Sequence, residues 1–126
     1  MNALTLEWVD KAEGDLVTAE RELRARKLPN YDSACFHAQQ MAEKYLKAFL
    51  QEQGSPFPKT HHLVSLLELC AEIDVLFNLH EGSLIALDGY AIRFRYPGDS
   101  ADKSDAKNAV ANAKIIREFV RARLGL

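Results

Sequence analysis

The chain has few of the residues that hold small disulfide-rich or metal-bound domains together. Only two of its 126 residues are cysteines, Cys35 and Cys70, and each lies within an apolar pattern of helical spacing. Their separation fits neither a disulfide framework nor a zinc site, in which cysteines recur in close pairs. We therefore expect two buried, reduced thiols.

Long apolar runs are also absent. No stretch approaches the ~18 apolar residues of a membrane-spanning helix, and the opening MNALTLEWVDKAEGD becomes acidic where a secretion signal needs its apolar segment. The sequence accordingly predicts a cytoplasmic protein that binds no membrane.

The chain also has no large excess of charge of either sign, since 16 basic and 18 acidic residues give a formal net charge of −2. The strong basic excess of nonspecific nucleic-acid binders is missing, although a local basic patch remains compatible with this balance. The four histidines lack the spacing of a helix-borne metal site, and no glycine-rich phosphate loop is present. We expect neither a metal nor a cofactor.

What the sequence does contain is helical periodicity, and no segment alternates like a strand. The expected helices are Leu4–Lys27, Tyr31–Gln53, His61–Ile73, Leu84–Arg93, and a last one from Ser100 or Ser104 to Arg123. Thr60 and Ser83 are the expected caps of the third and fourth helices. Short linkers and the absence of repeats predict one domain, residues 1–126. Its class is all-α, an up-and-down antiparallel bundle of four main helices plus a short extra helix.

The expected helix from Tyr31 to Gln53 has a broad apolar face opposite a polar stripe. The core face comprises Ala34, Ala38, Met41, Ala42, Tyr45, Ala48 and Phe49, with Cys35 and Leu46 at its edge. The polar stripe comprises Ser33, His37, Gln40, Lys44, Lys47 and Gln51. Phe36 and Leu50 stand among polar neighbours. They either contact another subunit or pack beneath the third or fourth helix.

The last helix combines an apolar face with a basic flank. The inward face comprises Ala106, Ala109, Val110, Ala113, Ile116 and Val120, and the flank comprises Lys103, Lys107, Lys114, Arg117 and Arg121. Eight basic and four acidic residues between Ala91 and Arg123 leave a local charge of about +4. The flank is either a solvated helix face or a contact for an anion.

The segment GYAIRFRYPGDS, residues 89–100, gathers arginines and aromatic rings where a helix must end. The guanidinium groups of Arg93 and Arg95 suit a phosphate, and Tyr90, Phe94 or Tyr96 suit stacking on a base. The same residues also suit structure, because a cation at a helix C-terminus binds the last free carbonyls. Both interpretations remain open. His61, beside the expected third helix, is similarly either a structural cap or a proton-transfer group.

Four segments together resemble the HEPN domain family, named for higher eukaryotes and prokaryotes nucleotide-binding. They are LEWVDKAEGDLVTAE, YDSACFHAQQMAEKYLKAFL, PKTHHLVSLL and GYAIRFRYPG, which cover nearly the whole chain. The resemblance implies a helical bundle that forms a homodimer and pairs with a minimal nucleotidyltransferase, as toxin and antitoxin do. It also implies a nucleotide- or RNA-binding role.

Within that family the chain is similar to the RYP subgroup, whose signature matches Arg95, Tyr96 and Pro97. By the same resemblance, His37, Gln40 and Lys44 are candidate ligand neighbours, together with His61.

Many active relatives in the family are metal-independent ribonucleases with an arginine followed after a few residues by a histidine. Here no histidine follows Arg93 or Arg95, because His80 is the last one. Arginine is a poor proton-transfer group, so the usual arrangement is incomplete. The preferred expectation is therefore a binding module. The alternatives are a ribonuclease in which His37 or His61 supplies the missing group beside Arg93 or Arg95, and a purely structural scaffold.

Overall fold

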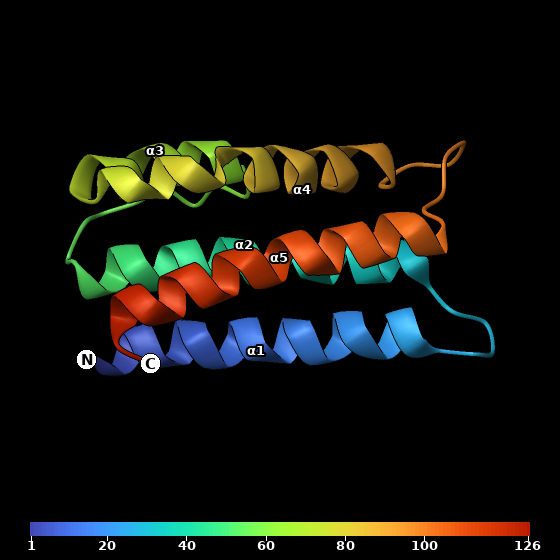
Figure 1. The fold of residues 1–126 in the computed structure, drawn as a ribbon, viewed down its shortest axis with the longest axis horizontal. Helices are drawn as coiled ribbons and strands as arrows, with labels where there is room; N and C mark the ends of the chain where they lie inside the picture. Colours follow the sequence, from blue (N-terminus) through green and yellow to red (C-terminus); the bar gives the residue numbers. More distant parts are fainter.

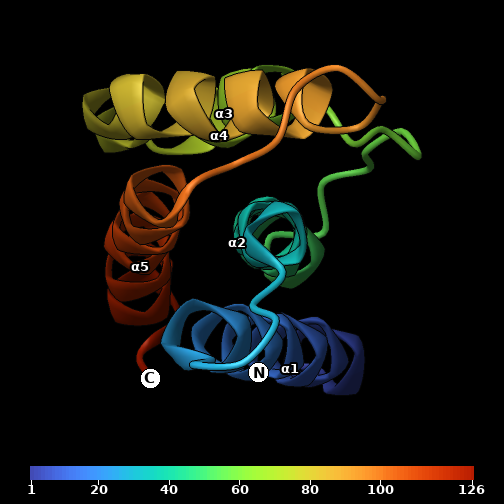
Figure 2. The ribbon, with the colours of Figure 1, turned by 90° about the vertical axis from the view of Figure 1, so that its right-hand side faces the viewer.

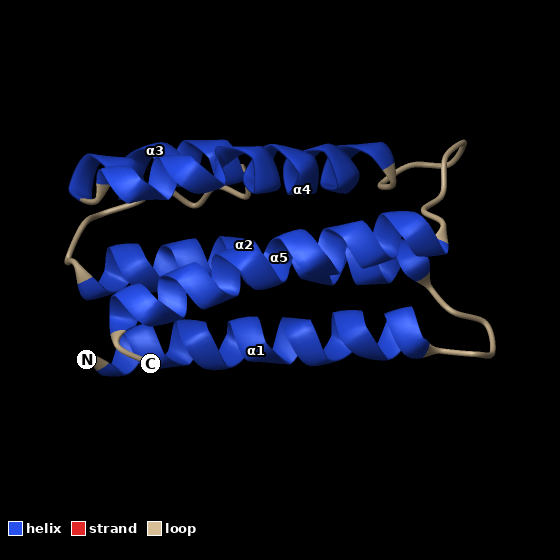
Figure 3. Ribbon diagram, viewed as in Figure 1, coloured by secondary structure: helices blue, strands red, loops and turns tan.

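The computed structural model describes residues 1–126 and consists of helices and loops (Figure 3). The helices are α1 (Ala3–Arg24), α2 (Tyr31–Glu52), α3 (Leu63–Ile73), the 3-10 helix η1 (Val75–His80), α4 (Glu81–Arg93) and α5 (Lys103–Leu124). This confirms the all-α class predicted from the sequence. The pairs α1–α2 and α2–α5 make the most extensive helix contacts.

Helix α2 occupies the centre of the bundle. Figure 2 shows it nearly end-on, with α1 and α5 beside it and the α3–α4 layer beyond, whose helices are seen from the side and cross the direction of α2. Both termini lie at one end of the bundle, whereas the start of α2 and the end of α4 lie at the other (Figure 1). None of the helices is both long and apolar enough to cross a membrane.

The core forms where the predicted apolar faces of α2 and α5 meet those of the other helices. Every residue assigned to the core face of α2 is buried, and so is each of the six assigned to the inward face of α5. Many of these residues are alanines, which allow the helix axes to approach closely. Burial also raises the pKa of the Cys35 and Cys70 thiols to about 12. The thiols are reduced and buried, as expected.

The central position of α2 decides between the two interpretations of Leu50, one of the two ambiguous residues on its polar side. Leu50 is fully buried, because α2 is also covered by α3 and α4, so the interpretation of Leu50 as a subunit contact is wrong. Lys47 is also buried, with 6% of its surface exposed, although its position in the polar stripe predicted an exposed side chain. Phe36, in contrast, keeps 45% of its surface exposed.

Three helix starts differ from the sequence expectation. Helix α3 is capped by the His62 side chain rather than by Thr60, and the Asp88 carboxylate also accepts from the backbone N–H of Leu63. Helix α4 begins at Glu81 instead of Leu84, because η1 leads directly into it. Helix α5 is capped by Asp102.

In that last case Asp102 and Asp105 each accept from the other's backbone N–H, a capping box that ties up two of the free N–H groups at the helix start. Ser100 and Ser104, the expected first residues, therefore do not serve as the cap. Aspartate is as strong an N-cap as serine, and residue type alone did not separate these neighbours.

Candidate functional site

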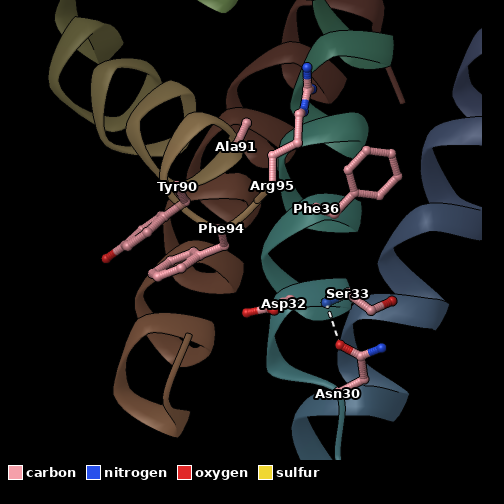
Figure 4. A pocket seen from close by; sticks show the side chains of 8 residues that line it. All are labelled: Asn30, Asp32, Ser33, Phe36, Tyr90, Ala91, Phe94 and Arg95. Carbon is pink, nitrogen blue, oxygen red and sulfur yellow. Dashed lines mark hydrogen bonds between the residues drawn. The ribbon is translucent and has the colours of Figure 1, made fainter. Parts of the chain in front are cut away.

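A pocket of about 400 Å³ lies between the start of α2 and the end of α4, away from the chain termini. Eight residues line it: Asn30, Asp32, Ser33, Phe36, Tyr90, Ala91, Phe94 and Arg95 (Figure 4). Half of them are apolar, so the pocket combines rings with a few polar groups and one guanidinium. Small-molecule sites have this mixture.

Two helix ends create the walls. Helix α2 starts where it does because Asn30 accepts a hydrogen bond from the backbone N–H of Ser33 at 2.9 Å (Figure 4). Helix α4 ends at Arg93, four residues before Pro97, whose ring would clash with the carbonyl of Arg93 in a continued helix. Gly98 then takes a φ of 110°, which reverses the chain toward α5.

An aromatic pair forms one side of the pocket. The rings of Tyr90 and Phe94 are nearly parallel, with centroids 5.8 Å apart and an angle of 14° between their planes (Figure 4). The Asn108 amide on α5 donates to the Tyr90 hydroxyl at 2.6 Å, and Phe94 is only 8% exposed. The pair is therefore held in place before any ligand arrives.

The two arginines of the motif have different surroundings. Arg93 Nε donates to Asp99 Oδ2 at 2.8 Å, and its guanidinium lies 4.8 Å from the centre of the Phe94 ring. This hydrogen bond raises the pKa of Arg93 and lowers that of Asp99. Arg95 makes no ion pair or side-chain hydrogen bond within the chain. Its side chain extends past Phe36, away from the stacked Tyr90 and Phe94 rings (Figure 4).

The family model for the HEPN domain matches residues 5–123. The chain belongs to the HEPN domain family. Two solved structures are similar to it over 94% of this chain and 96% of theirs. They are TT1696 from Thermus thermophilus, with 28% identity and a TM-score of 0.71, and ST0689, described as an archaeal HEPN homologue, with 25% identity and a TM-score of 0.74. No curated protein matches the sequence.

The remaining residues that the HEPN resemblance singled out lie outside the pocket wall. Tyr96 is 69% exposed, and Gln40 donates to the side chain of Gln39. His37 and Lys44 both bind Asp15 of α1, with His37 Nδ1 2.8 Å from Asp15 Oδ1. The ring of His37 nevertheless meets that of Phe36 edge to face, with centroids 5.2 Å apart. His37 thus stands one side chain away from the pocket.

His61 belongs to a separate cluster on the middle of α2. Its Nδ1 lies 2.9 Å from Glu43 Oε1, and the other oxygen of Glu43 accepts from Lys47 at 3.0 Å. Gln39 donates to the backbone carbonyl of His61. These contacts attach the α2–α3 loop to α2. Arg95 lines the pocket, whereas His61 does not.

The basic flank of α5 is largely neutralised by acids of α1. Glu13 binds both Arg117 and Arg121, and Glu20 binds Lys114 at 2.8 Å. Lys103 and Lys107, on the first two turns of α5, make no ion pair and remain exposed. Of the segment's charges, the pocket end therefore keeps four basic residues and three acidic ones, Asp99, Asp102 and Asp105, so the positive excess there is about +1 and smaller than the sequence suggested.

Sequence reasoning missed the α2 half of the pocket: Asn30, Asp32, Ser33 and Phe36. The signal that was available was Phe36 itself, an aromatic residue on a polar stripe. It also missed Asp15 and Glu43, the carboxylates that hold the histidines, because an acid on α1 or within α2 carries no mark of its distant partner. No cluster of three histidine, cysteine, aspartate or glutamate side chains is arranged to hold a metal ion.

Proposed function

We propose that this HEPN domain is a binding module that holds a phosphate-bearing ligand, a nucleotide or a nucleotide of an RNA strand, in the pocket between α2 and α4. The observation that supports it is Arg95. Arg95 has no acidic partner in the chain and lines a pocket of about 400 Å³ that three aromatic rings also line, with its guanidinium extending past Phe36. An unpaired guanidinium beside rings offers the two contacts that a nucleotide needs.

Each part of the ligand has a matching group. A planar guanidinium binds two phosphate oxygens at once, and Arg95 is free to do so. A base can stack on an aromatic face, for which Phe36 or the Tyr90–Phe94 pair is available. The polar Asn30 and Ser33 side chains remain for hydroxyl or base-edge contacts. Lys103 and Lys107 add positive charge near the same end of the bundle.

Two protein partners accompany the module, as the resemblance implies. One is a second copy of the chain, and the other is a minimal nucleotidyltransferase with which the domain forms a toxin–antitoxin type pair. In this arrangement the module contributes ligand recognition rather than phosphoryl transfer.

Calorimetric titration with ADP and with a short single-stranded RNA tests the pocket. Arg95→Ala should weaken binding of one of these probes by about tenfold or more, as expected for a charge-assisted bidentate contact. Arg93→Ala is the matched control, since Arg93 is already bound to Asp99. It should change the affinity by less than about twofold. Equal affinity of wild type and Arg95→Ala, with unchanged helical circular dichroism, would remove the site.

A second candidate function is metal-independent RNA cleavage, and the His37–Asp15 pair favours it. Because Nδ1 of His37 faces the carboxylate, Nε2 is left as an unpaired ring nitrogen, one ring away from the pocket. A histidine held this way can act as a general base. RNA incubated with the protein in chelator should then be cleaved, and His37→Ala should abolish cleavage. Intact RNA at high protein excess rejects this candidate.

A further inference from the structure

The outward side of α4 carries an alternating stripe of glycine and isoleucine. Gly82, Ile85, Gly89 and Ile92 are separated by three, four and three residues, which places them on one side of a helix. Ile85 is 53% exposed and Ile92 is 72% exposed. On its other sides α4 packs against α2, α3 and α5, and no helix lies beyond its outward side in either view of the bundle (Figures 1 and 2).

The protomer itself does not need the two glycines. Neither has a positive φ, and a Cβ added at either would meet no atom within 4 Å. Glycine in a helix is less favourable than alanine, because it loses more conformational freedom on folding. Glycine is an advantage on such a surface where another backbone or a large side chain approaches closely.

The stripe is complementary to itself. In an antiparallel pair of α4 helices related by a twofold axis at Leu87, Ile85 faces the partner's Gly89 and Ile92 faces the partner's Gly82. A single register satisfies all four positions, because both glycine–isoleucine pairs are centred on Leu87. Each isoleucine then fills the space that a glycine leaves open, as in the isologous interface of a twofold dimer.

The charges at the two ends of α4 favour the same direction. Glu81 is the first residue of the helix and Arg93 is the last, and this pair is also centred on Leu87. Arg93 is paired with Asp99, and the unpaired Arg95 follows it two residues later, so this end stays basic. An antiparallel pair therefore brings the acidic end of one helix level with the basic end of the other, whereas a parallel pair would align like charges. The opposed helix dipoles add to this preference.

We propose that two copies of the chain dimerise through the Gly82–Ile92 stripe of α4 in this antiparallel register. This inference rests on the proposed function, which names a second copy of the chain as a partner, and it adds the surface through which the two copies bind. Ala91 and Arg95, in the pocket wall, lie at the end of the stripe. The start of the partner's α4 therefore comes beside the mouth of the pocket, so each site has a neighbour from the second copy.

Light scattering and sedimentation equilibrium of the full chain test the dimer. The wild type should have twice the protomer mass of 14.2 kDa. Gly89→Leu should raise the dimer dissociation constant by about tenfold or more, because the added side chain occupies the space for the partner's Ile85. The control is Gly14→Leu, at a glycine of α1 with equally open surroundings, and it should leave the dimer intact. A wild type that stays monomeric, or a dimer that tolerates Gly89→Leu, overturns the proposal.

Exchange of the two residues tests the register. Ile85→Gly and Gly89→Ile should each weaken the dimer, whereas the double variant should restore it, since isoleucine again faces glycine. The double variant also keeps the helix composition of the wild type. If it fails to restore the dimer although its circular dichroism is native, the antiparallel register is wrong.

The dimer and the ligand site in the pocket can be tested independently of each other. Arg95→Ala should lose ADP or RNA binding and keep the dimer mass. Loss of the dimer interface with retained ligand binding would overturn only the α4 surface, and a dimer without ligand binding would overturn only the proposed function.

Discussion

Arg117 and Glu13 join the last helix to the first through two parallel hydrogen bonds. Arg117 Nε donates to Glu13 Oε2 at 2.9 Å, and Nη2 donates to Oε1 at 2.7 Å. The bond raises the pKa of Arg117 and lowers that of Glu13. Glu13 also accepts from Arg121, which itself donates to the Tyr45 hydroxyl. The middle of the basic flank therefore serves the α1–α5 contact and is not free for a ligand.

Glu13→Gln should destabilise the fold by about 1–2 kcal/mol, because it leaves Arg117 and Arg121 close together without the charge that both bind. The thermal midpoint should fall by about 4–8 °C in a domain of this size. Glu118→Gln is the control, since Glu118 also binds Arg117 but has a side chain that is 75% exposed. It should change the midpoint little. Equal shifts of the thermal midpoint in the two variants would show that the Glu13 ion pairs stabilise the fold no more than the exposed Glu118 pair does.

The lowered pKa of Glu13 also predicts an acid-dependent loss of stability. A carboxyl group whose pKa is lower in the folded state binds fewer protons there, so its stabilisation is present above the ordinary value of 4.5 and is lost as the pH falls through the folded-state pKa. Denaturant unfolding from about pH 6 to about pH 3 should show this loss. The free energy of unfolding should depend less steeply on pH in Glu13→Gln than in the wild type. An identical dependence on pH would exclude Glu13 as the source of the acid-dependent loss.

Asp32→Asn should tighten the binding of an anionic ligand. Asp32 lines the pocket and accepts from the backbone N–H of Ala101 at 2.7 Å, a contact that an asparagine oxygen can keep. Removing one negative charge about 7 Å from a phosphate in water should raise the affinity by about threefold. Titration with ADP in low salt measures the change, and Asp10→Asn, which removes an exposed charge of α1 outside the pocket, is the matched control. Weaker binding by Asp32→Asn would mean that the ligand donates to that carboxylate.

Neither thiol should react in the native protein. Cys35 and Cys70 are both buried, and a pKa of about 12 leaves about a thousandfold less thiolate at about pH 8 than an ordinary cysteine has. A colorimetric thiol reagent should label two groups rapidly in denaturant and neither on the same timescale without it. Rapid labelling of one group in the native state would show local opening of the core around α2.

The helices and their inward faces could be predicted from the sequence, because both depend on the local spacing of apolar residues. The cap of α5 was missed because serines and aspartates stand close together along this part of the chain, and only the mutual bonds of Asp102 and Asp105 decide among them. Two interpretations of Leu50 stayed open, because helical spacing locates a residue on a helix but does not show how many neighbours surround that helix.

Only the α4 wall of the pocket could be predicted from the sequence. The arginine-aromatic segment at the end of α4 has a distinctive composition, so Tyr90 and Arg95 attracted attention. Sequence could not separate Arg93 from Arg95, because the difference is the position of Asp99 after the turn at Gly98. The α2 wall depends on which helix ends meet in space, and no local pattern reports that.

The two chain ends lie together at the end of the bundle opposite the pocket (Figure 1). A fluorophore, surface tether or purification tag at either end would therefore leave the Arg95 wall facing solution. The same proximity makes a circular permutant feasible, in which a short glycine-rich linker joins the old ends and new ends open in the α2–α3 connection. Such a rearranged chain would separate the order in which the helices are synthesised from the way they pack.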